Sequence, residues 1–179
     1  MIGKRLGPYR IDRELGSGGM GKVYAATGPA GVVALKVVHP HLLETPGFFK
    51  RFMREAQLGQ SIRHENVVRT LDCDQEIGGG KAQCFLVMEL MTGGTAQDLL
   101  QPGPIEWREA TRIISNTCRG LVAIHEAGLI HRDIKPSNIM LAATRASRRK
   151  RFNATGLEDM DLGRIFSATS RFSRESEAR

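Results

Sequence analysis

The chain has 179 residues, of which 41% are hydrophobic and 25% are charged, a composition typical of a globular protein and not of a disordered one. It is long enough for one domain or two small ones, and no apolar run approaches the roughly 18 residues that a membrane-spanning helix needs. The net charge is +7, of which residues 142–179 carry +4. We expect a cytoplasmic protein with no membrane segment and no secretory leader.

Cysteine and histidine give no sign of a structural metal or of disulfides. The three cysteines, Cys73, Cys84 and Cys118, are too few and too scattered for a disulfide framework or a four-ligand zinc site. His39 and His41 stand two positions apart, but no second pair of ligands accompanies them. We therefore expect reduced thiols and no metal bound by this histidine pair.

The first half of the chain predicts an antiparallel sheet. Between Tyr9 and Leu15, apolar and charged residues alternate, with Tyr9, Ile11 and Leu15 on one face. A glycine-rich turn, a strand at 23–26, the turn signal at 28–31 and a strand at 32–38 follow. Strands at 66–73 and 83–90, separated by the glycines at 78–80, complete a five-stranded sheet.

Two helices are predicted around this sheet. Thr45 and Pro46 suit the N-cap and first position of a helix whose apolar face comprises Phe48, Phe49, Phe52, Met53, Ala56 and Ile62. A longer helix is predicted from Glu106 to Ala127, with Gly128 after its end. Its expected buried stripe comprises Ala110, Ile113, Ile114, Thr117, Leu121 and Ile124. The apolar pattern stops after Leu141, and we expect residues 142–179 to form a basic, poorly ordered tail.

The sequence from Gly16 to Gly21 has the pattern G-x-G-x-x-G, which alone also fits a dinucleotide-binding turn. A dinucleotide fingerprint leads from a strand into a helix, whereas Val23 and the residues after it continue as a strand. The loop therefore joins two antiparallel strands, where its backbone N–H groups can cover phosphates. An ordinary glycine-rich hairpin remains the alternative.

Lys36 lies in the apolar strand at 32–38, and burying its ammonium group is costly without a partner charge. Glu55, in the following helix beside Phe52, is the predicted partner. In the alternative, Glu55 pairs with Arg51 on the helix surface and Lys36 reaches solvent.

The segment His131-Arg132-Asp133-Ile134-Lys135-Pro136-Ser137-Asn138 concentrates polar residues directly before an apolar strand. An aspartate can orient and deprotonate an attacking hydroxyl group, an asparagine can bind a metal ion, and a lysine can offset phosphate charge. A solvated loop could carry the same residue types, but seldom in this order.

Together these three motifs resemble those of the eukaryotic-type serine/threonine protein kinases, and the variant around Met20 is most similar to bacterial members. The resemblance implies an α+β protein-kinase-like fold. It comprises a five-stranded antiparallel small lobe with one helix, then the first helices and catalytic loop of an incomplete helical large lobe. The implied kinase domain covers 9–163, with the small lobe at about 9–90 and the start of the large lobe at about 91–141. The chain would be a C-terminally truncated or divergent member.

The resemblance also implies roles for individual residues. Asp133 would be the catalytic base, Lys135 a γ-phosphate contact, and Lys36, held by Glu55, a contact of the α- and β-phosphates. Asn138 would bind Mg²⁺. The residues implied to bind ATP are Leu15, Gly16, Ser17, Gly18, Gly19, Met20, Gly21, Lys22, Val23, Ala34, Lys36, Met88, Glu89, Met91 and Met140. The implied activity is transfer of the γ-phosphoryl group of Mg-ATP to serine or threonine hydroxyl groups of protein substrates.

The end of the chain departs from the family pattern. The nearest match to the expected Asp-Phe-Gly is Asp161-Leu162-Gly163, whose Asp161 would be a second Mg²⁺ ligand, but it lies 23 positions (161 minus 138) after Asn138. A short hairpin would need about a dozen. A chance match is the alternative, and no Ala-Pro-Glu follows. A pseudokinase-like fragment that binds ATP or a partner without transfer is thus a second hypothesis. A third, nucleic-acid contact by the basic tail, rests on charge without stacking aromatic residues, and we expect no such partner.

Overall fold

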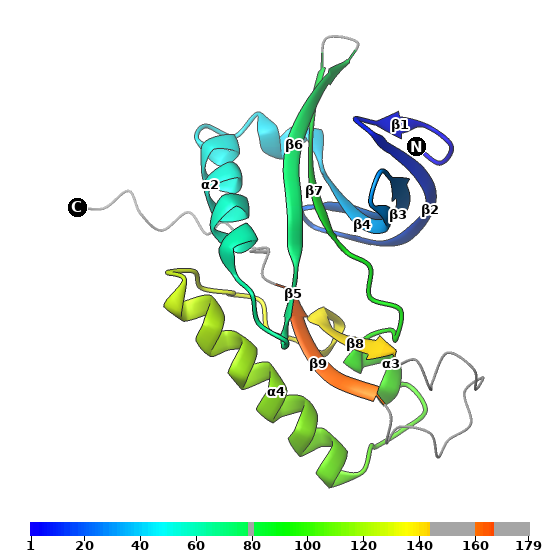
Figure 1. The fold of residues 1–179 in the computed structure, drawn as a ribbon, viewed down its shortest axis with the longest axis vertical. Helices are drawn as coiled ribbons and strands as arrows, with labels where there is room; N and C mark the ends of the chain where they lie inside the picture. Colours follow the sequence, from blue (N-terminus) through cyan, green and yellow to red (C-terminus); the bar gives the residue numbers. More distant parts are fainter. Residues whose placement is uncertain (79–80, 144–159, 167–179) are drawn as a thin grey trace.

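A computed structural model describes the backbone of residues 1–78, 81–143 and 160–166, and the side chains of 1–77 and 82–142. Six strands form one antiparallel sheet in the order β1-β2-β3-β4-β7-β6 (Figure 1). Their bounds are Arg5–Leu6 for β1, Tyr9–Gly18 for β2, Gly21–Gly28 for β3, Gly31–Val38 for β4, Thr70–Gly78 for β6 and Lys81–Glu89 for β7. Strands are present in all five predicted ranges, although the range 66–73 is divided between two strands, and the short β1 adds an edge.

Strand β2 is less regular than its alternating sequence predicts. Its pairing with β3 shifts register between Ile11 and Arg13 and again between Glu14 and Gly16. Each irregularity moves the following side chains to the other face of the strand. Ile11 is buried as predicted, whereas Leu15 is exposed.

The predicted strand at 66–73 is in fact two strands. Val67–Val68 forms the short strand β5, which belongs to a different sheet, and β6 begins at Thr70. The hairpin of β6 and β7 is paired up to Gly78 and Lys81, and the tip at 79–80 lies outside the described residues.

Helix α2, Phe48–Ser61, lies along β6, and a four-residue helix, α1, Pro40–Leu43, precedes it (Figure 1). The predicted start at Thr45 and Pro46 is wrong. The Phe48 N–H donates to the Thr45 carbonyl in a turn, and the N-cap is Gly47, whose φ of 72° few other residues adopt. Phe48, Phe52 and Ala56 are buried, but Phe49 is exposed.

Helix α4, Trp107–Glu126, confirms the predicted long helix. Glu106 is its N-cap, and Gly128 follows its end with φ 76°. Within the predicted stripe Ile113, Thr117 and Ile124 are buried, but Ile114 is 62% exposed. A short helix that the sequence reading missed, α3, Ala96–Leu100, precedes α4 and begins with a capping box between Thr95 and Asp98.

A second, three-stranded sheet lies between α4 and the six-stranded sheet (Figure 1). Its order is β5-β9-β8, where β8 is Ile139–Ala143 and β9 is Met160–Phe166. Strand β9 pairs parallel to β5 and antiparallel to β8. The sequence reading predicted no strand after Leu141, so β9 is an addition, while residues 144–159 and 167–179 lie outside the described part of the chain.

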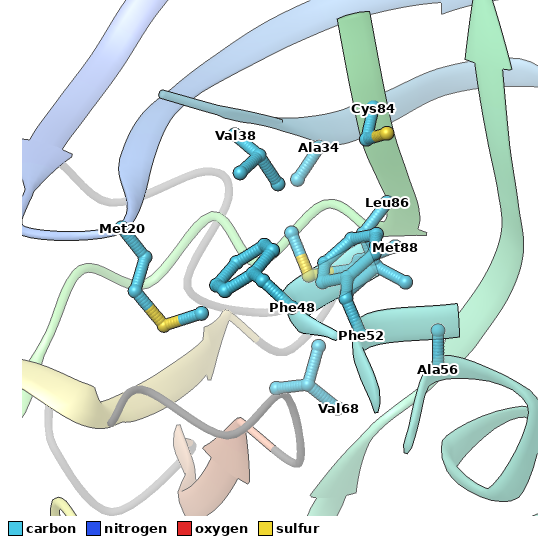
Figure 2. Packing of buried hydrophobic residues seen from close by; sticks show 10 residues of the cluster. All are labelled: Met20, Ala34, Val38, Phe48, Phe52, Ala56, Val68, Cys84, Leu86 and Met88. Carbon is cyan, nitrogen blue, oxygen red and sulfur yellow. The ribbon is translucent and has the colours of Figure 1, made fainter. Parts of the chain in front are cut away.

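The hydrophobic core consists of three clusters. One lies between the six-stranded sheet and α2 and includes Ala34, Phe48, Phe52, Leu86 and Met88 (Figure 2). A second covers the opposite face of the sheet, and a third joins α4 to the three-stranded sheet. Strand β4 is therefore buried on both faces, and the one lysine in it belongs to a dry environment.

Candidate active site

The β2–β3 hairpin carries the glycine-rich loop, as the sequence predicts. Its ladder closes at the pair Gly18 and Gly21, and β3 continues as a strand paired with β4. A β-carbon at Gly21 would collide with the carbonyl oxygen of Val37, so no larger residue fits there. Around Gly16, Gly18 and Gly19 no atom lies within 4 Å of a built β-carbon, which leaves one side of the loop open to a ligand.

Lys36 is buried in β4, with a residue exposure of 9%. Burial lowers the pKa of the Lys36 ammonium group to about 8, and the nearby Asp133 carboxylate opposes this shift. At pH 7 the amine remains about nine-tenths protonated. The alternative in which Lys36 reaches solvent is therefore wrong, and its side chain lies within the electrostatic reach of Asp133, almost a hundred residues later.

Glu55 lies half-buried on α2, in the turn between the buried residues Phe52 and Ala56. This places it on the edge of the helix face that packs against the sheet. Its pairing with Lys36 stays a prediction.

The segment after α4 folds as a tight loop around Asp133. Asn138 donates through Nδ2 to the Asp133 carbonyl oxygen at 2.8 Å and to its carboxylate Oδ2 at 3.0 Å. Lys135 Nζ forms an ion pair with the same Oδ2 at 2.9 Å. The three side chains that the sequence predicts to act together are thus in direct contact.

The conformation of this loop also depends on two residues for which the sequence predicts no role, His131 and Arg132. His131 is 2% exposed, and its Nδ1 accepts the Asp133 N–H at 3.3 Å. Arg132 has a φ of 62°, which is uncommon for a residue with a side chain and is found at tightly constrained sites. In the sequence only the order His-Arg-Asp indicates these two residues, because their conformational role depends on the folded loop.

Five of the apolar residues implied to bind ATP belong to one region of the core. Ala34 and Met88 are buried members of the cluster between the six-stranded sheet and α2. Val23, Met91 and Met140 are partly buried and pack against this cluster. Leu15 is exposed and is not a member of this cluster.

The segment between β7 and α3 forms backbone hydrogen bonds with β8, the strand that follows the loop around Asp133. Glu89 ends β7 and accepts the Arg69 N–H through Oε1 at 2.8 Å. The Gly93 N–H donates to the Leu141 carbonyl at 3.0 Å, and the Leu141 N–H donates to the Gly94 carbonyl at 2.9 Å. Met140 is thereby held beside this connecting segment.

Asn138 is oriented so that it can serve a metal ion. Because its amide nitrogen donates to Asp133, its oxygen is directed elsewhere, and an amide oxygen is a ligand that Mg²⁺ accepts. Asp161 lies in β9, where its backbone pairs with Ala142 of β8, four residues after Asn138. Strands β8 and β9 thus pair as the two strands of a hairpin do, although Asp161 lies 23 positions (161 minus 138) after Asn138. Its role as a ligand stays a prediction.

The three cysteines, Cys73, Cys84 and Cys118, are free thiols. Among the side chains of 1–77 and 82–142, no three His, Cys, Asp or Glu residues gather so that they could hold a metal ion. His39 and His41 stack on one another, and the expectation that this pair binds no metal stays a prediction. None of the helices in the described chain is long and apolar enough to cross a membrane.

Comparison with known protein families matches residues 9–174 to the protein kinase domain. Serine/threonine-protein kinase pkn2 of Myxococcus xanthus is 38% identical over 153 residues, which cover 84% of this chain and 18% of that protein. PknB of Mycobacterium tuberculosis is 36% identical over 141 residues, covering 77% of this chain and 22% of PknB. The chain thus spans about a fifth of the length of these curated relatives.

Solved structures show the same fold. A crystal structure of the Mycobacterium tuberculosis PknI kinase domain matches with a TM-score of 0.68 and 28% identity, covering 78% of this chain and 57% of that one. A second PknI structure reaches a TM-score of 0.71 at 23% identity, covering 96% and 65%. The described chain thus shares its fold with these kinase domains. The chain therefore belongs to the protein kinase family, and the bacterial serine/threonine kinases are among its relatives.

Proposed function

We propose that this chain forms the nucleotide-binding and catalytic part of a serine/threonine protein kinase that transfers the γ-phosphoryl group of Mg-ATP to protein hydroxyl groups. One observation carries the proposal. The buried Lys36 ammonium group of the sheet interacts electrostatically with Asp133, the carboxylate that contacts Lys135 and Asn138. One buried cation of the sheet and one cation of the loop therefore both interact with this carboxylate.

ATP binding would use both parts of this site. Ala34, Val23, Met88 and Met140 offer apolar surface to the adenine ring, next to the backbone of the segment after β7. Lys36 is a cation in a largely dry setting, and phosphate oxygens would offset the cost of burying its charge. Mg²⁺ would be held by the Asn138 oxygen, by Asp161 and by the phosphates.

For transfer, the bound nucleotide supplies the phosphoryl group and the protein supplies position and charge. The Asp133 carboxylate would accept a hydrogen bond from the attacking hydroxyl group and take its proton. Asn138 and Lys135 both bind Oδ2 of Asp133, so the carboxylate cannot rotate freely. The Lys135 ammonium group, which is partly exposed, would also offset charge on the transferred phosphoryl group.

The names of the relatives support serine and threonine as acceptors, and Lys135 at its place in the loop is typical of that class. Because the reaction consumes ATP, we propose that it takes place in the cytoplasm. We further propose that residues 9–90 form the small lobe and that the large lobe starts at residue 91.

The test is transfer of labelled phosphate from Mg-ATP to a generic protein substrate such as casein, followed by phosphoamino acid analysis. Asp133→Asn should lower the rate by at least about 100-fold, the usual contribution of a general base. Asp12→Asn is the matched control, because Asp12 lies in β2 and binds Arg10 and Thr27 instead.

Two results would contradict the proposal. Phosphate transfer that is unaffected by Asp133→Asn would remove the assigned base. ATP binding without any transfer by the unmodified chain would favour the pseudokinase-like alternative.

A further inference from the structure

The glycine-rich loop has an ordered tip, although its glycines make few contacts of their own. Nothing lies within 4 Å of the positions that β-carbons would take at Gly16, Gly18 and Gly19. Glycine also has the largest backbone freedom to lose on ordering. Apart from the pairing of the two strands, the tip is attached through the carbonyl groups of Gly18 and Met20 and through the Met20 side chain.

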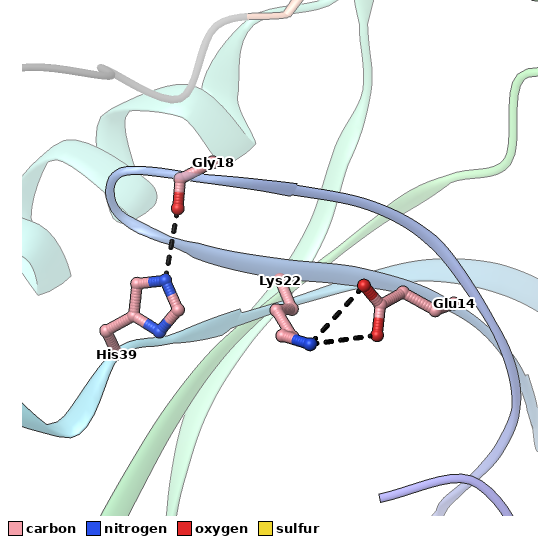
Figure 3. A network of polar contacts seen from close by, with 4 residues as sticks. All are labelled: Glu14, Gly18, Lys22 and His39. Atoms are coloured by element: carbon pink, nitrogen blue, oxygen red, sulfur yellow. Dashed lines mark hydrogen bonds and ion pairs between the residues drawn. The ribbon is translucent and has the colours of Figure 1, made fainter.

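A single residue, His39, binds the carbonyl groups of Gly18 and Met20, the two residues that flank Gly19. Its main-chain N–H donates to the Met20 carbonyl at 2.9 Å, and its ring Nε2 lies 3.1 Å from the Gly18 carbonyl oxygen (Figure 3). A carbonyl oxygen can only accept, so Nε2 carries the hydrogen atom in this contact. The ion pair between Lys22 and Glu14 lies further along the same hairpin, on its exposed surface (Figure 3).

His39 is itself held in place. It precedes Pro40, which restricts its backbone to the extended region, and its φ and ψ are −64° and 132°. Its ring stacks on the ring of His41, with centroids 5.5 Å apart. The donor that faces Gly18 is therefore presented from a rigid support at the end of β4.

The side chain of Met20 adds a third attachment. It is 9% exposed and belongs to the cluster that contains Val38 of β4 and Phe48 of α2 (Figure 2). The loop tip is thus connected to the strand that carries Lys36 and to the first turn of the helix that carries Glu55.

The hydrogen bond to Gly18 has a consequence for phosphate binding. No peptide bond in the described chain is cis, so the Gly18 C=O and the Gly19 N–H point in opposite directions across their shared peptide plane. Because the carbonyl group faces His39, the N–H of Gly19 faces away from His39. A β-carbon built on Gly19 also meets no atom within 4 Å, so no neighbouring group crowds this residue. A phosphate oxygen there would meet a donor and not a carbonyl oxygen.

We propose that His39 is a positioning residue that orients the Gly18–Gly19 peptide so that its N–H can bind a nucleotide phosphate. This rests on the proposed function, since it presumes that ATP binds below the loop. His39 contacts Gly18, Met20 and His41 and none of the residues expected at adenine, so its effect should be specific for the phosphate part of the ligand.

The test compares three substitutions in the full chain. His39→Gln places an amide N–H near the position of Nε2 and should preserve the bond to Gly18. His39→Asn reaches only the position of Nδ1 and, like His39→Ala, should lose that bond, while the main-chain bond to Met20 is kept in all three. The first measurement is the ¹⁵N relaxation of Gly18 and Gly19 without nucleotide. The order parameters should fall from about 0.85 to below about 0.6 in the Ala and Asn variants only.

The second measurement is the dissociation constant for Mg-ATP and for adenosine, which lacks the phosphates. The Ala and Asn variants should bind Mg-ATP about fivefold more weakly, the factor that one neutral hydrogen bond is worth, and adenosine unchanged. The Gln variant should resemble the unmodified chain for both ligands. Equal losses for the two ligands, unchanged Mg-ATP affinity in the Ala variant, or tighter Mg-ATP binding would each overturn the proposal. If the unmodified chain binds neither ligand, the proposed function fails, whereas the relaxation data still decide whether His39 orders the loop.

Discussion

The central part of the six-stranded sheet, from Val33 to Val38 of β4, and helix α4 differ in how completely their apolar side chains are covered. Strand β4 is buried on both faces, with Leu35 in one cluster and Ala34 in another. Helix α4 buries only the face that carries Ile113, whereas Trp107, Ile114 and Val122 are 66%, 62% and 56% exposed. The two regions therefore contribute unequally to the stability of the described chain.

This difference matters because the candidate site is divided between the two regions. Lys36 belongs to the well-covered sheet, and Asp133 lies in the loop that follows the partly covered helix. The position of the lysine is thus secured by dense packing on both faces of a strand. The position of the aspartate depends more on the local hydrogen bonds around His131 and Asn138.

Truncating the centre of the sheet should have the largest effect. Leu35→Ala should lower the free energy of unfolding by about 4 kcal/mol, because the fully buried side chain leaves a cavity in a well-packed region. Urea denaturation followed by far-UV circular dichroism measures this. Val32→Ala in the same strand removes an exposed side chain and should cost less than about 0.5 kcal/mol. Equal effects would show that the sheet is not the stable region.

Replacing the buried lysine should stabilise the sheet while removing function. The Lys36 pKa is lowered from 10.5 to about 8, so the unfolded chain binds more protons at this position between those pH values. This group therefore lowers stability below pH 8, and the loss is relieved as the pH rises toward 10.5. The stability advantage of Lys36→Met should shrink by about 3 kcal/mol between pH 7 and pH 10.5. Denaturation of both proteins across this pH range checks it, and a constant difference would contradict it.

Removing the N-cap of α4 should have a smaller and more local effect. The Glu106 carboxylate accepts the N–H groups of Arg108 at 2.8 Å and Glu109 at 3.3 Å. Glu106→Ala should cost about 1 kcal/mol, and Glu106→Gln, which keeps an acceptor, should cost less. Hydrogen exchange should speed up in the first turn of α4 and stay unchanged in β4. Equal acceleration in both would show that the two regions open as one unit.

A charge on the uncovered face of α4 should have the smallest effect. Ile114→Glu should change the free energy of unfolding by no more than about 0.5 kcal/mol, because the side chain is already largely in water. Its neighbour supplies the control, since Ile113 is 4% exposed and Ile113→Glu should unfold the helix. Thermal denaturation distinguishes the two variants. A strong loss in Ile114→Glu would mean that this face is covered in solution.

Regular elements were predictable from the sequence where one physical signal dominated. The alternation and turns at 9–38 located β2, β3 and β4, and Gly128 marked the end of α4. Prediction failed where two signals competed. The Thr45-Pro46 start signal was overridden by a turn ending in Gly47, and the bulges of β2 exposed Leu15.

For the candidate site, the sequence indicated which residues lie together better than it indicated what holds them in place. Asp133 contacts both Lys135 and Asn138, and Lys36 is buried, while the roles of these residues stay predictions. The conformation of Arg132 and the attachment of the loop by His39 depend on tertiary packing that no local pattern encodes. For His39 the sequence raises only the question of metal binding, because residue type suggests chemistry but not hydrogen-bond partners.

The parallel pairing of β5 with β9 sets the order in which the chain can fold. Val67 pairs with Ile165, 98 positions (165 minus 67) further along, whereas the neighbouring strands β2, β3 and β4 pair through short turns. Contacts between distant segments form slowly because the intervening chain must be ordered first. During synthesis, the six-stranded sheet can therefore form before β9 has left the ribosome. The pairing of β8 with β9 is completed after that sheet, so a newly made chain can bury Lys36 before the strand pair that follows Asn138 has formed.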